Sequence, residues 1–480
     1  CGTGISDSSG NSIHSVVQNK NWYWTNGCNF DLPVKTDQPA LASPSDLEGN
    51  VYLTSNLSVG VSDPEGKNLS VTYFVQPCPS PAPEDFTVIG LPDTQHYVSN
   101  LFGGTNEIYK SQTNWIAQNR IAENIVYVHG LGDCVQNGDN GGDPIEWQRV
   151  DTAMKIIEDP VSTQLQEGIP YGLNVGNHDQ SPIGEVSGTT NFFNSYFGES
   201  RFLGRSYYGG HFGSNNNNNY SFFSAGGMNF IVINTEYNYN NIDGQVAQWM
   251  INLLTQYSDH FAIIGSHYML NGDGTFAPQG LAIYNVIKRF PNVILTQSGH
   301  VSAEANREDI YDGHKIISIM ADYQGRSYGG TGWMRLLKFS PVNNSITVKT
   351  YSPWLNQFET DSNSQFTYSL NMNPRTGYTI LGTNSNVPSG SLSSYTAGSL
   401  LPNTCYYWYV TVSNGATTTT SPVWKFTTVS ECTKINSFSP ITGAIGDTIQ
   451  INGKKLTVLS TVFLNATPAS FAVINDSTAK

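Results

Sequence analysis

The chain has 480 residues, enough for about two to four domains, and carries a formal net charge of −14. This charge argues against nucleic acid or an anionic membrane as a partner, because both require clustered Lys and Arg. Charged residues make up only 12% of the chain, well below the usual share of about a quarter. Asn, Ser, Thr, Gly and Tyr take their place, a composition that is common in secreted β-rich proteins.

The first residue is Cys1 rather than Met, which predicts that an N-terminal segment has been removed. A cleaved signal peptide would have this effect, and Cys1 could also be the lipidated end of a lipoprotein. No run in the sequence approaches the roughly 20 apolar residues that a membrane-spanning helix needs. We therefore expect an extracellular or cell-surface protein without a transmembrane segment.

The other cysteines suit an oxidising compartment, where disulfides persist. Cys405 and Cys432 sit at opposite ends of one β-rich segment, and Cys28 and Cys78 flank another. These two pairs are the predicted bridges, although other connectivities stay open. Cys134 is expected to be a buried free thiol. Sequons, which mark a glycoprotein but also arise by chance in an Asn- and Ser-rich chain, occur at Asn56, Asn68, Asn219, Asn343, Asn465 and Asn475.

The chain begins with a polar, irregular segment, residues 1–36, followed by short strand-like runs in residues 37–82. The runs "VYLTSNLSVGVSD" and "LSVTYFV" lie on either side of the turn "PEGKN". This pattern predicts an antiparallel hairpin in an immunoglobulin-like sandwich. The Pro-rich stretch "PCPSPAPED" then predicts a stiff linker.

In residues 85–358, apolar strand-like runs alternate with helical patterns, which predicts an α/β domain. One helix is expected to begin with Pro144, and another to be capped by Asp243. Between Gly198 and Gly227 lies a Gly-, Asn- and Tyr-rich insertion that contains "SNNNNNYS". We expect this insertion to be a mobile surface loop.

The remainder of the chain again consists of short strand-like runs. Residues 366–428 contain "LPNTCYYWYVTVSNG" and "SPVWKFTT", which resemble a fibronectin type III module. Residues 433–480 open with "INSFSPITGAIGDTIQING", which resembles the IPT/TIG immunoglobulin-like family, and the stretch is shorter than such a domain usually is. The domain is expected to be incomplete here. Exposed strand edges in such β modules could also support self-assembly.

Five short motifs follow apolar runs in the central segment, in a fixed order. Their side chains are carboxylates, amides and imidazoles, which bind divalent metals. The series resembles the calcineurin-like metallophosphoesterases, which implies an α/β sandwich of two mixed β-sheets flanked by helices. The motifs are Asp93-Thr94-Gln95, Gly132-Asp133, Gly176-Asn177-His178-Asp179, His267 and Gly299-His300.

The resemblance implies a role for each of these residues. One or two divalent ions of Fe, Mn or Zn would be bound, and an activated hydroxide would attack the phosphorus of a phosphoester. His178 would be the general acid, steadied by Asp179. Asp93 would bind the first metal and Asp133 would bridge the two. The second site would be completed by Asn177, His267 and His300.

Two positions depart from the family's pattern, and both would normally serve the first metal. Gln95 and Ser302 stand where the family usually has His, so Gln95 is at most a weak oxygen ligand. His96 would point away if its segment is extended, because neighbouring side chains then alternate. Asp322, in the stretch "ADYQGRSYGG", could line the pocket or belong to a structural loop.

These observations lead to two hypotheses from different classes. The first is a secreted or surface-attached metallophosphoesterase. The alternative is a catalytically weak or inactive protein of the same fold that serves in adhesion or assembly, as the loss of two first-site ligands would allow. The sequence does not identify the substrate beyond the phosphoester class.

Overall fold

The computed structural model divides into two compact units, and each is described by itself. The first comprises Cys1–Leu32 and Pro79–Thr376, and the second Pro33–Cys78 and Gly377–Lys480. The structure describes residues 22–25, 28–31, 35–79, 83–372, 377–398, 400–429, 434–442, 444, 446–454, 456, 462–464, 467–475 and 477–480.

The first unit contains a mixed sheet whose parallel part is formed by β7, β8 and β9. β17 pairs antiparallel with β7 on the other side, and the sheet order is β19-β18-β17-β7-β8-β9, with β20 also pairing with β18. The strands are β7 (Phe86–Leu91), β8 (Ile125–Gly130), β9 (Tyr171–Leu173), β17 (Met334–Ser340), β18 (Ser345–Ser352), β19 (Gln357–Glu359) and β20 (Gln365–Ser369).

A second mixed sheet of this unit has the order β10-β11-β12-β13-β14-β16-β15. Its centre is parallel, from β12 to β16, and its edges are antiparallel. β12 is buried along almost its whole length, as expected of a strand covered on both faces. The strands are β10 (Tyr208–His211), β11 (Asn219–Ala225), β12 (Met228–Thr235), β13 (Phe261–Ser266), β14 (Val293–Ser298), β15 (Glu304–Tyr311) and β16 (His314–Ala321).

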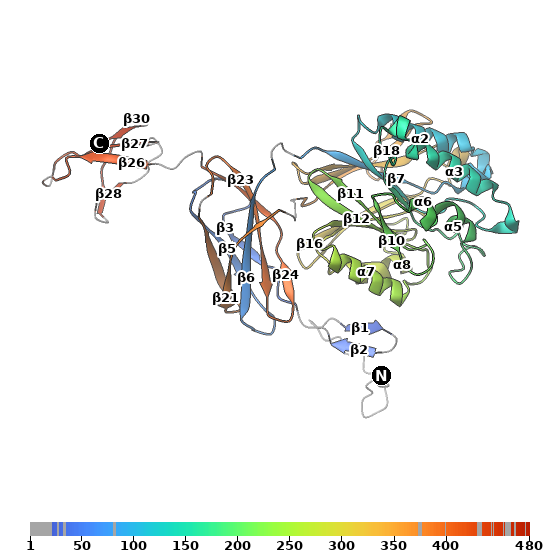
Figure 1. Ribbon diagram of the computed structural model, residues 1–480, viewed down its shortest axis with the longest axis horizontal. Helices are drawn as coiled ribbons and strands as arrows, with labels where there is room; N and C mark the ends of the chain where they lie inside the picture. Colours follow the sequence, from blue (N-terminus) through green and yellow to red (C-terminus); the bar gives the residue numbers. More distant parts are fainter. Residues whose placement is uncertain are drawn as a thin grey trace, which may run out of the picture. The chain divides into compact units, whose positions relative to one another are not determined.

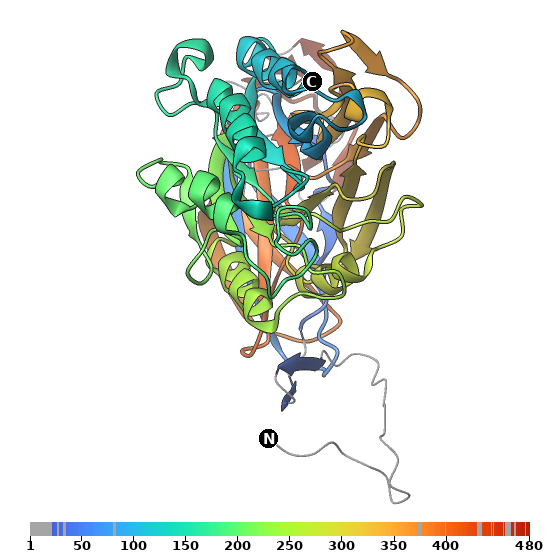
Figure 2. The same cartoon turned by 90° about the vertical axis from the view of Figure 1, so that its right-hand side faces the viewer.

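The two sheets pack face to face, and helices cover their outer faces (Figure 1, Figure 2). Phe86, Phe230 and Phe339 are among the residues buried between the sheets. α7 and α8 pack on the second sheet. α1, α2, α3, α5 and α6 share a cluster of buried residues with the first sheet and pack on it. The helices are α1 (Gln95–Ser99), α2 (Asn106–Asn119), α3 (Ile145–Glu158), α4 (Pro160–Thr163), α5 (Asn191–Phe197), α6 (Glu199–Phe202), α7 (Gly244–Gln256) and α8 (Pro278–Ile287).

This arrangement of mixed sheets and outer helices agrees with the α/β architecture expected from the sequence. Pro144 stands at the start of α3, and Asp243 caps α7 by accepting hydrogen bonds from the backbone of Gln245 and Val246. No helix in the described ranges is long and apolar enough to cross a bilayer. The unit extends past the predicted boundary at residue 358, because β20 belongs to its first sheet.

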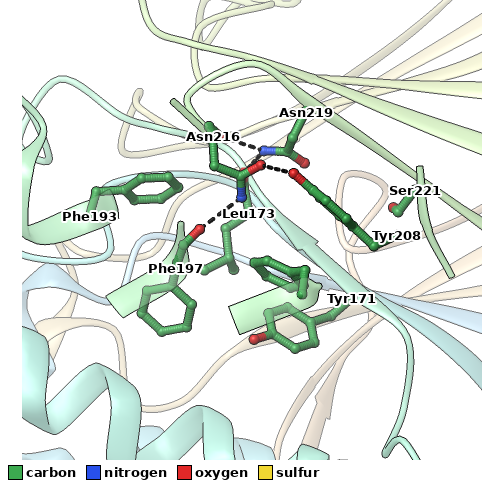
Figure 3. A pocket seen from close by; sticks show the side chains of 9 residues that line it. Tyr171, Leu173, Phe193, Phe197, Tyr208, Asn216, Asn219 and Ser221 are labelled. Atoms are coloured by element: carbon green, nitrogen blue, oxygen red, sulfur yellow. Dashed lines mark hydrogen bonds between the residues drawn. The ribbon is translucent and has the colours of Figure 1, made fainter. Parts of the chain in front are cut away.

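The Asn-rich insertion is not the mobile surface loop that its composition predicted. Asn216, Asn217, Asn218 and Asn219 are all buried, with exposed fractions of 2–8%. Asn216 donates to the carbonyl of Phe197 and accepts from the hydroxyl of Tyr208 (Figure 3). These bonds surround a cavity of about 10 Å³, and Asn219, a predicted sequon, lines it. The run is therefore a hydrogen-bonded part of the core.

The second unit is a β-sandwich, and its strands correct two predictions. β5 and β6 do not form a hairpin, because β5 pairs with β3 and β22 while β6 pairs with β21 and β23. Residues 37–82 and 366–428 are therefore not separate modules. The sandwich strands are β3 (Ala40–Ser43), β4 (Glu48–Val51), β5 (Ser55–Val61), β6 (Leu69–Pro77), β21 (Thr379–Val387), β22 (Ser391–Ala397), β23 (Cys405–Ser413), β24 (Thr418–Thr420) and β25 (Trp424–Thr428).

A disulfide joins the two sequence segments of this sandwich. It links Cys78, just after β6, to Cys405, the first residue of β23, so the predicted pairs Cys28–Cys78 and Cys405–Cys432 are wrong. The two strands are hydrogen-bonded neighbours, which brings the cysteines together. Cys134 is free and buried, as predicted. Cys1 and Cys432 lie outside the described residues.

Both ends of the chain contain further strands. β1 and β2 pair antiparallel within the segment that was predicted to be irregular. In the range 433–480, β26, β27, β31 and β30 form one sheet, and β28 pairs with β29. These strands are β1 (Trp22–Thr25), β2 (Cys28–Asp31), β26 (Lys434–Ser439), β27 (Gln450–Lys454), β28 (Val462–Leu464), β29 (Thr467–Ala469), β30 (Val473–Asn475) and β31 (Thr478–Ala479). The immunoglobulin-like, fibronectin-like and IPT/TIG-like assignments stay predictions.

Candidate metal centre

The five motifs lie in loops that follow parallel strands of the first unit. Asp93 follows β7 and Asp133 follows β8, while Asn177 follows β9 in the same sheet. His267 and His300 follow β13 and β14 of the second sheet. Because the carboxyl ends of parallel strands meet at one edge of a sheet, side chains far apart in the sequence converge there.

Three of these side chains meet closely. Asp133, His267 and His300 each offer a ligand atom, and these atoms all lie within 4.8 Å of one another. His267 Nε2 lies 3.2 Å from Asp133 Oδ2 and 4.0 Å from Asp93 Oδ2. A carboxylate and two imidazoles at this spacing could hold a divalent ion.

The orientation of His267 suits a metal ligand. Its Nδ1 lies 2.8 Å from the carbonyl oxygen of Leu131, which can only accept, so Nδ1 carries a proton. Nε2 is left to face the carboxylates, as in metal-bound histidines held by a backbone carbonyl. Burial favours a low pKa, but Asp133 and Asp93 outweigh it and raise the pKa of His267 to about 10. A bound cation could replace that proton.

One orphaned polar atom fits the same ligand set. Asn177 Oδ1 is buried and has no hydrogen-bond partner among the described residues, whereas His267 Nε2 faces Asp133 Oδ2 at 3.2 Å. An unpartnered buried oxygen costs about 1–3 kcal/mol, and a cation bound to Asn177 Oδ1 would remove that cost. The donor set of Asp133, Asn177, His267 and His300 therefore fits a divalent metal.

The carboxylates differ in their electrostatic surroundings. Burial and the charge of Asp322 raise the pKa of Asp93 well above its usual value. Burial also acts to raise the pKa of Asp133, but His267 outweighs it and the pKa is lowered. Burial, followed by the positive charge of His267, lowers the pKa of His300 to about 4, which keeps this imidazole neutral and able to bind a metal.

The backbone around the ligands is closely fitted. A Cβ at Gly176 would collide with the Asp133 carboxylate, and one at Gly299 would collide with that of Asp93. The glycine of one motif therefore makes room for the carboxylate of another. Asp133 and His300 have φ of 49° and 71°, in the left-handed region that costs a non-glycine residue free energy. Such strain is concentrated at functional sites.

His178 lies at the edge of this group, and its support differs from the predicted one. Its backbone N–H donates to Asp133 Oδ1 over 2.8 Å, and its Nδ1 donates to the carbonyl of Gln136 over 2.9 Å. The imidazole is half-buried. Gln136, rather than Asp179, therefore fixes the ring and leaves Nε2 as the atom that could carry a proton to a substrate.

Asp179 has a structural role instead of contacting His178. Its carboxylate accepts hydrogen bonds from the backbone N–H of Gly176 over 2.8 Å and of Val135 over 3.2 Å. It thereby ties together the two loops that carry Asp133 and Asn177. Burial and the nearby Asp133 raise the pKa of Asp179 to about 8.

Gln95 and His96 also lie differently from the expectation. The segment is not extended, because α1 begins at Gln95. Gln95 Nε2 donates to Gln324 Oε1, and His96 Nδ1 lies 3.1 Å from the carbonyl oxygen of Gln324. Burial lowers the pKa of His96, and its charge also interacts with that of His178. His96 therefore lies near the site instead of pointing away from it.

The structure adds aromatic neighbours that the sequence analysis did not identify. The ring of Tyr268 lies 4.4 Å from that of His300, and Tyr237 lies 5.2 Å from it. Tyr239 packs near Tyr268 and is largely exposed. In a Tyr-rich chain, nothing in the local sequence distinguished these three residues from others.

Other acidic residues in the unit have structural partners. Asp139 accepts hydrogen bonds at the start of α5 from the backbone of Asn191 and Phe192. Glu304, Glu359 and Asp361 offer carboxylate atoms within 4.8 Å of one another. Arginine occupies this second group, since Arg326 pairs with Glu359 at 2.7 Å and with Glu304 at 3.3 Å.

No protein-family model matches the chain. An uncharacterized protein of Bacillus subtilis strain 168, YvnB, is 32% identical over 381 residues, which cover 73% of this chain and 28% of that protein. A crystal structure of a conserved uncharacterized protein from Streptococcus pneumoniae TIGR4, described as a predicted phosphoesterase, aligns with a TM-score of 0.26 and 9% identity. That alignment covers 60% of this chain and 98% of the other.

Proposed function

We propose that this protein is a metal-dependent phosphoesterase that acts outside the cytoplasm. The observation that carries the proposal is the convergence of Asp133, His267 and His300 within 4.8 Å, beside the unpartnered oxygen of Asn177. The calcineurin-like resemblance assigns the same four residues to one metal. The Cys78–Cys405 disulfide is compatible with an extracellular location.

A divalent cation held by Asp133, Asn177, His267 and His300 would supply charge neutralisation at the phosphoryl oxygens and activation of the attacking water. The protein's own residues would do the remainder. The oxygen of the attacking water would bond to phosphorus and release a proton to solvent as the ester P–O bond breaks, and His178 Nε2 would donate a proton to the leaving oxygen. Its Nδ1 bond to Gln136 keeps Nε2 directed outward during that transfer. General acid catalysis of this kind contributes about 10²–10⁴-fold.

The test combines metal content with turnover. Elemental analysis of the purified protein should find at least one Fe, Mn or Zn per chain, and an aryl phosphate diester or monoester should be hydrolysed. His178→Ala should lower kcat by about 10²–10⁴-fold without loss of metal. The change His260→Ala, at a partly buried histidine after α7 that packs on Phe222 and Tyr257, serves as the matched control and should leave kcat unchanged.

A chain that binds metal but hydrolyses neither ester across a range of pH values, with added Mn²⁺ or Zn²⁺, would contradict the proposal. That result would instead support the inactive adhesion or assembly protein of the same fold.

A further inference from the structure

Three tyrosine rings form a row that begins beside a candidate metal ligand. The ring centre of Tyr268 lies 4.4 Å from that of His300, and the ring centre of Tyr237 lies 5.2 Å from it. Tyr268 is also 6.3 Å from Tyr237 and 6.3 Å from Tyr239, with angles of 26° and 25° between the ring planes. These distances are typical of interacting aromatic rings. The tyrosine row of Tyr237, Tyr268 and Tyr239 therefore starts in contact with the imidazole side of the metal centre.

Exposure to solvent increases along the tyrosine row. Tyr237 is 4% exposed, Tyr268 is partly exposed and Tyr239 is 56% exposed. A single exposed aromatic side chain is ordinary on a protein surface, but Tyr239 continues a row of rings that leads from the metal centre to solvent. Small-molecule sites are lined mainly by apolar and aromatic side chains. The row therefore offers an aromatic surface to a molecule bound at the metal centre.

The buried member of the row is held by the loop that carries Asn177. The backbone N–H of Tyr237 donates to the carbonyl of Val175 over 2.9 Å, and the carbonyl of Tyr237 accepts from Gln180 Nε2 over 3.1 Å. Val175 and Gln180 stand just before and just after the motif that spans residues 176–179. The position of Tyr237 is therefore tied to that of the metal ligands.

Tyr268 is also held in place. It directly follows His267 in the sequence, and its hydroxyl donates to Asn271 Oδ1 over 3.2 Å. Asn271 is fixed in turn, because its Nδ2 donates to Thr275 Oγ1 over 3.0 Å. A side chain that is already ordered loses little conformational entropy when a ligand packs against it. Tyr268 is therefore suited to bind a rigid group.

A phosphoester at the metal centre carries at least one ester group on its phosphorus, and a group that points past His300 meets Tyr268 and then Tyr239. We propose that Tyr268 and Tyr239 bind a planar ring in this group, which makes the substrate a phosphoester of an alcohol that carries an aromatic ring. The inference rests on the proposed function, because it takes the phosphorus to be held at the metal centre. A saturated ring of similar size has similar apolar area, but only an aromatic ring adds the stacking interaction of aromatic pairs.

Pairs of esters that differ in the aromaticity of one ring test the proposal. Benzyl phosphate is compared with cyclohexylmethyl phosphate, and 2-phenylethyl phosphate with 2-cyclohexylethyl phosphate, each as the monoester and as the methyl diester. The full chain is loaded with Mn²⁺ or Zn²⁺. The wild type should prefer the aromatic member of at least one pair by about two- to tenfold in kcat/KM, mainly through KM, as one aromatic pair would provide.

Variants at the exposed end of the row locate this preference. Tyr239→Ala should reduce it by about two- to tenfold, and Tyr239→Phe, which keeps the ring, should retain it. Tyr52→Ala, at a 71% exposed tyrosine of the second unit, is the matched control and should keep the wild-type preference. Calorimetric titration with benzylphosphonate and cyclohexylmethylphosphonate, which are not hydrolysed, should show the same differences in dissociation constant.

Metal content and circular dichroism of Tyr239→Ala should match those of the wild type, which separates loss of the ring from damage to the metal centre. Equal kcat/KM values within both pairs, or a Tyr239→Ala variant with the wild-type preference, would overturn the inference but leave the proposed function standing. A metal-loaded wild type that hydrolyses none of these esters would overturn the proposed function, and the inference with it.

Discussion

The two sides of the candidate metal centre are built from different chemistry. One side uses imidazoles, His267 and His300, from loops that follow the second sheet. The other uses oxygen atoms, from Asp93, Asp133 and Asn177, in loops that follow the first sheet. The difference teaches that each sheet brings its own kind of donor, so the candidate centre depends on both sheets. The following predictions test that contrast, beginning with the largest effect.

Replacing His267 by Ala should have the largest effect, because it removes the imidazole that faces both Asp133 and Asp93. Breaking a buried charged pair costs about 3–5 kcal/mol, so the metal-free variant should unfold at much lower urea concentration. Zn²⁺ binding should be lost with it. His260→Ala is the control, and an unchanged urea midpoint for His267→Ala would contradict the prediction.

A second buried histidine, His129, has its pKa shifted in the opposite direction from that of His267. Burial lowers the pKa of His129 to about 4, against the hydrogen bond that its Nε2 donates to Asn234 Oδ1, while an unfolded histidine titrates near 6.5. Between these values the unfolded chain binds a proton that the folded chain does not. The contribution of His129 to stability is therefore fully present above pH 6.5 and is lost as the pH falls toward 4, by about 3 kcal/mol in total.

Urea unfolding of the metal-free protein between pH 7.5 and pH 4.5 measures this loss of stability, with His129→Gln for comparison. The variant should lose less stability over that interval than the wild type does. Parallel curves for the two proteins would show that His129 is not buried in its neutral form.

The support of Asp133 and Asn177 can be weakened without replacing a ligand. Asp179→Asn leaves one oxygen for the two backbone N–H groups of Gly176 and Val135, and directs an amide N–H at the other. Changes in such supporting groups lower metal affinity or activity by about 10–100-fold. The Zn²⁺ dissociation constant measures the effect, and Asp259→Asn on the surface is the control. An affinity equal to that of the wild type would remove Asp179 from this role.

The smallest effect concerns the buried Asn run. Asn217 Oδ1 accepts from Thr190 and from Asn194, each over 2.8 Å, so Asn217→Ala should cost about 1–3 kcal/mol. Ser214, just before the run, is exposed, and Ser214→Ala should change the unfolding free energy by less than about 0.5 kcal/mol. Equal losses for the two variants would show that the run contributes through its backbone alone.

The sequence predicted the parts of the site that depend on local order. Asp133, His267 and His300 each follow an apolar strand, and strand ends in an α/β sheet converge by geometry. It could not place Asp322, because the loop that carries this residue contacts Gln95 and Ser302, which lie far from it in the sequence. A motif reports which residues a position has, but not which distant loop they contact.

The sandwich and the Asn run show a second limit of sequence reasoning. β5 and β6 alternate in polarity on either side of a turn and look like a hairpin, yet their partners β22 and β23 lie more than three hundred residues later. Cys405, the disulfide partner of Cys78, lies 327 residues after it. Strand pairing at such distances leaves no local signal. The Asn run is polar in composition, but the groups that satisfy its amides, such as Thr190 and Tyr208, are invisible until the chain is folded.

The division of the second unit between Pro33–Cys78 and Gly377–Lys480 has a consequence for biosynthesis. The whole of the α/β sheet pair is inserted between two halves of one sandwich. During synthesis from the N-terminus, β5 and β6 emerge early, but β5 must wait for β22, and β6 for both of its partners, β21 and β23. The inserted unit, whose sheets are complete by β20, can fold first. The Cys78–Cys405 bond can then form only late, once the two segments of the sandwich have been made and have paired.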